Sequence, residues 1–192
     1  GVDYAVSGIS ASLTWFHTDF QDKITQYMMP NWDISWDNIG DATVSGIESE
    51  VSCDLGILLN LGWELRPYAT FIYLTEYEDE ETGDELLYTA DLRATYGLSL
   101  SDYNDLSADL SFAYTGEEYY EDYESGYPAP VRKSGGYTTA NLSIKTRLVS
   151  FDELGRLDLI TEIRNLTNKR YAHVAGYPAP GRNYYAGLTY TY

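Results

Sequence analysis

Apolar and polar residues alternate with a period of two along most of this chain. In the segment 88–100, polar residues such as Asp91 and Arg93 separate a regular apolar set: Tyr88, Ala90, Leu92, Ala94, Tyr96, Leu98 and Leu100. Successive side chains of a β-strand point to opposite faces, so this pattern predicts strands with one apolar and one polar face. It predicts about eight strands, near 9–20, 42–54, 67–76, 88–100, 106–116, 137–149, 157–166 and 182–192.

The connections between the predicted strands alternate in length. Segments 102–105 and 151–156 are short, whereas the long connections are rich in Gly, Pro, Asn and acidic residues: 28–41, 77–87, 117–136 and 167–181. The segment 55–66 is more apolar, and we expect Pro67 to limit where the next strand begins. Strands of about 9–11 residues, with short turns at one end and long loops at the other, are typical of outer-membrane β-barrels.

Charged residues fall repeatedly on the face opposite to the apolar one. A basic side chain that faces lipid at the midplane costs about 2–4 kcal/mol, so we expect the charged set to point into a barrel. Its members are Glu48, Glu50, Asp91, Arg93, Asp109, Lys145, Arg147, Glu162 and Arg164. The alternation alone also fits a soluble β-sandwich with one wet face.

Tyrosine is frequent, with 20 Tyr against 5 Phe and 2 Met, and many tyrosines lie near the ends of the alternating segments. Aromatic residues with a polar tip are favoured at membrane interfaces, although tyrosine is also a common strand residue. No stretch approaches the roughly 18 consecutive apolar residues of a spanning helix, and the mean hydropathy is -0.35. The alternating strands are therefore the candidate membrane-crossing elements.

The formal net charge of -18 argues against a nucleic-acid partner, whose phosphates would be repelled. Acidic residues cluster in 76–85 and 117–124, where solvated loops are the simpler interpretation and a cation site the alternative. The single Cys53 can form neither an intrachain disulfide nor a multi-cysteine metal site. His17 and His173 are the only histidines, and a lone His173 is a weak candidate for haem iron. We predict no cofactor and no metal site.

The pentapeptide GYPAP occurs twice, at Gly126–Pro130 and Gly176–Pro180, and each copy precedes an arginine, Arg132 or Arg182, by two residues. Shared loop geometry is the simpler interpretation, and a duplicated ligand-contact motif is the alternative. An enzyme would need a nucleophile and a base that converge. The sequence shows no persuasive pairing of this kind, so we do not expect an enzyme.

The carboxy-terminal block EIRNLTNKRYAHVAGYPAPGRNYYAGLTYTY resembles the last two barrel strands of the TonB-dependent outer-membrane receptors. An Asn-Leu strand end, a tyrosine, a Gly-Pro loop, Gly181-Arg182 and an aromatic terminus recur there in order. The segments LTWFHTDFQDKI, NIGDATVSGIESEV and RPYATFIYLTEYEDEETGDELLYTADLRATYGLSL are similar to other late barrel strands of this family. The resemblance spans essentially the whole chain, 1–192.

This resemblance implies an all-β, antiparallel transmembrane β-barrel, of which the chain forms about eight strands. Because such barrels have 22 strands and a plugged lumen, residues 1–192 correspond to the last third, without the plug domain and the TonB box. The chain starts at Gly1 without a signal peptide, so either processing removed one or the chain is part of a longer polypeptide. The alternative is a complete eight-stranded barrel with a structural or adhesive role.

The implied function is TonB-dependent uptake of a scarce nutrient across the bacterial outer membrane, with a ferric siderophore as the first candidate. The implied partners are this ligand, outer-membrane lipid, the TonB complex and the barrel-assembly machinery, which would recognise Tyr192 although Phe is usual at that position. Ferric siderophores are often anionic and aromatic. We therefore expect contacts in the outer loops from Arg132, Lys133, Arg182, Tyr127 and Tyr177. The alternative is that they balance nearby acids.

Overall fold

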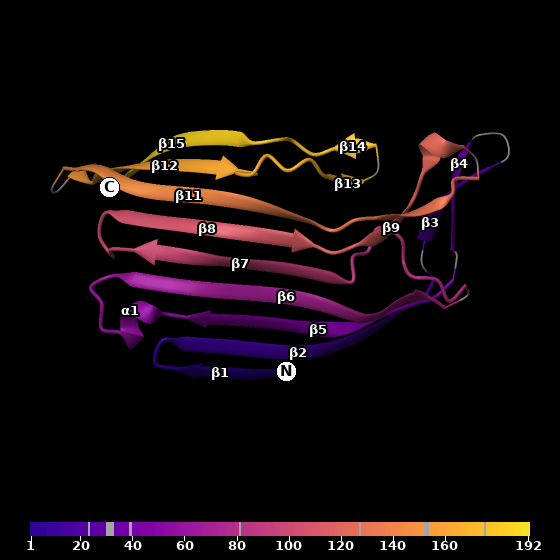
Figure 1. The fold of residues 1–192 in the computed structure, drawn as a ribbon, viewed down its shortest axis with the longest axis horizontal. Helices are drawn as coiled ribbons and strands as arrows, with labels where there is room; N and C mark the ends of the chain where they lie inside the picture. The colour runs from indigo at the N-terminus through magenta and orange to yellow at the C-terminus, as the bar shows by residue number, and fades with distance from the viewer. Residues whose placement is uncertain are drawn as a thin grey trace.

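The structure is a computed structural model, which describes residues 1–22, 24–29, 33–38, 40–80, 82–126, 128–151, 154–174 and 176–192. Its main feature is one antiparallel sheet of nine strands, each paired with the next main strand along the chain (Figure 1). In order across the sheet the strands are β1 (Val2–Val6), β2 (Ile9–Phe20), β5 (Ala42–Cys53), β6 (Glu64–Asp79), β7 (Leu92–Ser101), β8 (Leu106–Thr115), β11 (Tyr137–Ser150), β12 (Arg156–Arg164) and β15 (Asn183–Thr191).

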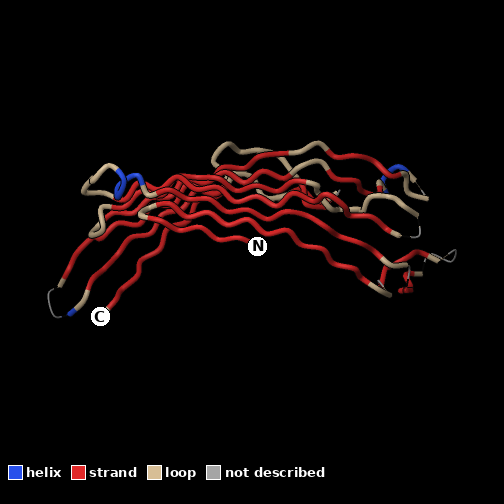
Figure 2. Tube along the Cα trace, turned by 90° about the horizontal axis from the view of Figure 1, so that it is seen from below, coloured by secondary structure: helices blue, strands red, loops and turns tan. Residues whose placement is uncertain are grey.

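Three short hairpins lie within the long connections, at one end of the sheet, on the right in Figure 1. They pair β3 (Ile24–Met28) with β4 (Ile34–Asn38), β9 (Glu118–Glu121) with β10 (Val131–Ser134), and β13 (Ala172–Val174) with β14 (Tyr177–Pro178). A 3-10 turn, η1 (Tyr123–Ser125), follows β9, whereas the helix α1 (Leu55–Leu58) lies with the short turns at the opposite end. The predicted alternation of short and long connections is confirmed, and Figure 2 shows that the sheet is twisted and curved.

The eight predicted strands all form, and β1 is a ninth that the alternation did not reveal, because it has only five residues. A two-residue turn, Ser7 and Gly8, joins β1 to β2. Both residues have positive φ, 21° and 85°. This is the backbone that tight antiparallel hairpins require, and it favours glycine.

Two predicted strand boundaries are wrong. The strand expected over 88–100 begins at Leu92, because Tyr88 has a φ of 58° and breaks the extended conformation. β6 begins at Glu64, before Pro67, which pairs with Leu98 of β7. β6 pairs with β5 only from Tyr68 onward. At Pro67, β6 therefore has β7 on one side and does not pair with β5 on the other. A missing backbone N–H is tolerated there.

Cross-strand register joins the apolar positions into one continuous face. Leu98 is opposite Leu110, which pairs in turn with Leu142, then Ile163, then Tyr184. Paired residues share a face, so the predicted inward charges lie together on the other face, with the exception of Asp91, which precedes β7. Those on the polar face are Glu48, Glu50, Arg93, Asp109, Lys145, Arg147, Glu162 and Arg164.

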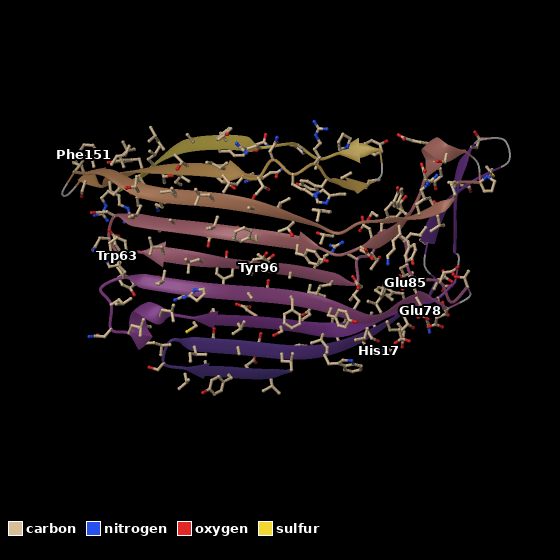
Figure 3. The ribbon with its side chains drawn as sticks, in the orientation of Figure 1. His17, Trp63, Glu78, Glu85, Tyr96 and Phe151 are labelled. Carbon is tan, nitrogen blue, oxygen red and sulfur yellow. The ribbon has the colours of Figure 1, made fainter. Side chains whose placement is uncertain are left out.

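The apolar face has no protein cover. Among the described residues the only buried apolar side chains are three alanines, whereas Trp15, Leu188 and Tyr184 are about two-thirds exposed. A soluble sandwich would cover such a face with a second layer, but a continuous exposed apolar face is the form that suits lipid. Aromatic residues also lie at the short-turn end, where Figure 3 labels Trp63 and Phe151. Within the described ranges, no helix has both the length and the apolar character to span a bilayer.

A candidate ligand cleft at the long-loop end

A cleft of about 570 Å³ opens at the long-loop end of the sheet, mainly between the β8–β11 and β12–β15 connections. Small-molecule sites commonly enclose roughly 300–1,000 Å³, so this volume suits a compact ligand. The most frequent lining residue is tyrosine: Tyr88, Tyr120, Tyr123, Tyr137, Tyr171 and Tyr177.

Three aromatic side chains form a packed cluster at the cleft. The rings of Tyr137 and Tyr171 stack with centroids 4.7 Å apart, and His173 meets Tyr171 edge-on at 5.2 Å. The Tyr137 hydroxyl lies 3.2 Å from Nδ1 of His173. Tyr137 starts β11 and, by alternation, shares the polar face with Lys145. The cluster therefore connects the cleft to the face expected to line the barrel.

Asn165 places the loop that enters the cleft after β12. It is buried, and its φ of 51° turns the chain out of the strand. Its Nδ2 donates to the Lys169 carbonyl and its Oδ1 accepts from the Lys169 amide, both at 2.8 Å, while its own amide donates to Oδ1 of Asn141 at 3.0 Å. Asparagine tolerates this left-handed conformation, and the closed loop brings Lys169 and Arg170 to the cleft.

Two of the predicted ligand residues hold the β9–β10 hairpin together. Nε of Arg132 lies 2.6 Å from Asp122 Oδ2, and Nη2 donates to Ser125 Oγ at 3.1 Å. The hydrogen bond from Ser125, and then the Arg132 charge, lower the pKa of Asp122. Lys133 pairs with Glu117 at 2.6 Å, and this contact raises the pKa of Lys133.

The other predicted ligand residues have different positions. Tyr177, in β14, lines the cleft and is 76% exposed. Arg182 lies outside the cleft lining: its amide donates to Asn168 Oδ1 at 3.0 Å and its Nη1 to the Tyr184 hydroxyl at 3.5 Å. Tyr127 lies outside the described residues. Of the four predicted residues that the structure describes, only Tyr177 lies in the cleft lining.

Lys169 and Arg170 are cleft residues that the sequence interpretation missed. Both are exposed, and neither side chain forms an ion pair within the part of the chain that the structure describes. Arg132 and Lys133, in contrast, are neutralised by Asp122 and Glu117. The run of two adjacent basic residues just after an Asn-Leu strand end was the signal available in the sequence.

A second polar cluster lies at the same end of the sheet, around His17 in β2 (Figure 3). Its Nε2 lies 3.0 Å from Asp19 Oδ1 and its Nδ1 2.7 Å from Ser45 Oγ. Asp, His and Ser also form the triad of serine hydrolases, but there Nε2 faces the serine and Nδ1 the aspartate, the reverse of the contacts of His17. Ser45 is 4% exposed and its hydroxyl donates to Glu76 at 3.1 Å. The serine is thus closed to a substrate. Over the described ranges, no group of three or more His, Cys, Asp or Glu residues could hold a metal ion.

A curved antiparallel sheet with an uncovered apolar face, a polar face and long loops around a cleft at one end is the wall of an outer-membrane β-barrel. The chain belongs to the TonB-dependent receptors: the family model described as TonB dependent receptor-like, beta-barrel, matches residues 1–166. Members of this family are outer-membrane receptors and transporters, not enzymes. The chain is accordingly an outer-membrane protein.

Solved structures of similar fold include the siderophore receptor PirA from Acinetobacter baumannii, at 20% identity and a TM-score of 0.74, over 99% of this chain and 30% of that chain. A mutant of the ferric enterobactin receptor PfeA from Pseudomonas aeruginosa has 24% identity and a TM-score of 0.72, over 97% of this chain and 29% of that chain. The copper transporter OprC has 18% identity and a TM-score of 0.70, over 97% of this chain and 29% of that chain. This chain therefore spans about three-tenths of the length of these structures.

Proposed function

We propose that this chain forms the carboxy-terminal third of a TonB-dependent receptor that imports a ferric siderophore, and that the cleft is part of its outer binding site. Support for the ligand class comes from the siderophore receptors among the structures of similar fold. The single observation that carries the proposal is the cleft itself, which combines stacked tyrosines with two cations that form no ion pair among the described residues.

Aromatic rings and cations suit the chemistry of ferric siderophores. Flat ligand groups stack on rings such as Tyr171 and Tyr177, and an anionic group on the chelate is attracted by Lys169 and Arg170. In this proposal Arg132 and Lys133 act indirectly, by holding the β9–β10 hairpin that forms one side of the cleft. Coupling to TonB and recognition of Tyr192 by the barrel-assembly machinery stay predictions.

The open edges of the sheet support a barrel larger than this chain. β1 and β15 each have one neighbouring strand. A bilayer has no water to satisfy the remaining backbone groups, and open sheet edges are not found in the hydrocarbon region. We propose that other strands of the receptor pair with these edges, rather than that residues 1–192 form a complete eight-stranded barrel.

Binding of ferric siderophores to the purified full-length receptor tests the proposal. A panel of ferric tris(catecholate) and ferric trihydroxamate complexes would be titrated while intrinsic tryptophan fluorescence is recorded. Stacking contributes about 0.5–1.5 kcal/mol per aromatic pair, so Tyr177→Ala should weaken binding by about two- to tenfold. Tyr103→Ala, at the short-turn end and 60% exposed, is the matched control and should bind normally. If no ferric complex binds the intact receptor, the proposed function is wrong.

A further inference from the structure

The cleft carries opposite charges on its two sides. The β12–β15 connection contributes Lys169 and Arg170, the basic wall, whereas the β8–β11 connection contributes Glu118, Glu121 and Glu124, the acidic wall. A further lining acid, Asp122, is neutralised by Arg132.

The acidic wall and the basic wall lie close together, but their charges do not form ion pairs with one another in the described structure. Glu124 Oε1 is 3.7 Å from the position that a Cβ on Gly176 would take, so the acidic wall reaches the loop that carries the basic wall. No ion pair joins the walls in the described structure, and Glu121 instead accepts a hydrogen bond from the Tyr123 hydroxyl. Charges of both signs thus line one aromatic cleft, and within the described residues no ion pair joins the basic wall to the acidic wall.

We propose that the cleft selects a mixed-charge ferric chelate, one that carries both an anionic group and a cationic group such as an ammonium. The anionic group would lie against the basic wall, the cationic group against the acidic wall, and the flat portion on Tyr137, Tyr171 and Tyr177. A ligand with negative charge only would meet the acidic wall unfavourably, and such like-charge contact discriminates between ligands. This inference rests on the proposed function and narrows its ligand class.

The test compares chelates of different charge on the full-length receptor. The probes are a trianionic ferric tris(catecholate), a ferric trihydroxamate with a pendant ammonium, and one with both a pendant ammonium and a carboxylate. Two double variants each remove two charges from one wall: Lys169→Gln with Arg170→Gln from the basic wall, and Glu118→Gln with Glu124→Gln from the acidic wall, where Glu121 keeps its charge. Asp84→Asn, in the β6–β7 connection, and Arg66→Gln, near the short-turn end of β6, make the same kind of charge change away from the cleft lining and serve as controls.

The unmodified receptor should bind the doubly charged probe most tightly, and each wall variant should weaken that binding by about two- to tenfold, the size expected when one or two partly exposed charge contacts are lost. The acidic-wall variant should strengthen binding of the trianionic probe, and both controls should leave all three affinities unchanged. Tightest binding of the trianionic probe, or an acidic-wall variant that binds the doubly charged probe normally, overturns this inference alone. Absence of binding to every probe overturns the proposed function as well.

Discussion

The Tyr68 side chain lies across Gly97 on the polar face of the sheet, so that a Cβ at position 97 would fall 2.6 Å from the tyrosine hydroxyl. Beyond the glycine, the hydroxyl donates to both carboxylate oxygens of Asp109, at 3.1 Å, and Ser99 donates to the same group at 2.8 Å. The Tyr68 ring of β6 thus passes over Gly97 of β7, and its hydroxyl is a hydrogen-bond donor to the carboxylate of Asp109 in β8. The polar face is therefore packed locally around Gly97.

This relationship predicts that Gly97→Ala destabilises the barrel. The added methyl group would also fall 2.6 Å from the Leu110 carbonyl, so both a side chain and a neighbouring strand must shift, at a cost of about 1–3 kcal/mol. The loss is measured as a lower unfolding temperature of the purified receptor. Gly187→Ala is the matched control, because nothing lies within 4 Å of that position. Equal unfolding temperatures for the two variants would contradict this packing.

Asp158 is a buried carboxylate near the short-turn end of the sheet. Its side chain is 3% exposed and lies 3.2 Å from Lys145 Nζ and 3.4 Å from Arg156 Nε. Asp158→Asn leaves two cations without their counter-charge, and we expect a loss of about 1–3 kcal/mol in the free energy of unfolding in urea. The more exposed pair of Glu162 with Arg164 provides the comparison. Glu162→Gln should cost less than about 1 kcal/mol, and an equal effect of both changes would argue against a buried role for Asp158.

The turn at Asp102 should loosen in acid. Its Oδ1 accepts hydrogen bonds from the amides of Leu106, Asn104 and Asp105, and these bonds lower the pKa of the carboxyl. The stabilising effect is therefore present above the unfolded pKa, which is about 3.9, and is lost as the pH falls through the lower folded value. Amide exchange of the turn, corrected for intrinsic rates, should accelerate in that window. Asp102→Asn should remove this pH dependence, and an unchanged profile would show that the carboxylate does not hold the turn.

The strands were predictable because side-chain alternation is local. Each main strand of nine or more residues reveals its own period, whereas β1 is too short and Tyr88 has a backbone conformation that no alternation encodes. The residues of the candidate site were harder to predict from the sequence. The sequence left Arg132 and Lys133 as candidates either for ligand contacts or for pairing with nearby acids, and the structure pairs them with Asp122 and Glu117 across the β9–β10 hairpin.

Lys169 and Arg170 were missed because the sequence does not show which loop residues come together in the fold. They reach the cleft because Asn165 closes the loop that follows β12, which is a property of three-dimensional geometry. The charge pattern along the chain cannot separate these two cations from the paired ones. Tyr177 was predicted as a stacking residue of an outer loop, because the family resemblance implies a ligand that is often aromatic.

Surface labelling tests which end of the sheet faces outward. With Cys53 replaced by serine, a cysteine introduced at Asp84, in the β6–β7 connection of the long-loop end, should react with an impermeant maleimide on intact cells. One at Asn104, in the short turn between β7 and β8, should react only after the outer membrane is opened. The reverse pattern would mean that the long loops lie in the periplasm.

We expect Lys169 and Arg170, which form no ion pair among the described residues, to attract the ferric ligand more strongly than Arg132 and Lys133, which are paired with Asp122 and Glu117. The most direct measurement is the Kd of the full-length receptor for the tightest-binding ferric chelate, in two double variants of equal charge. Lys169→Gln with Arg170→Gln should raise the Kd by about two- to tenfold, and Arg132→Gln with Lys133→Gln by less. A normal Kd for the first variant together with a raised Kd for the second would contradict the cleft as the ligand site.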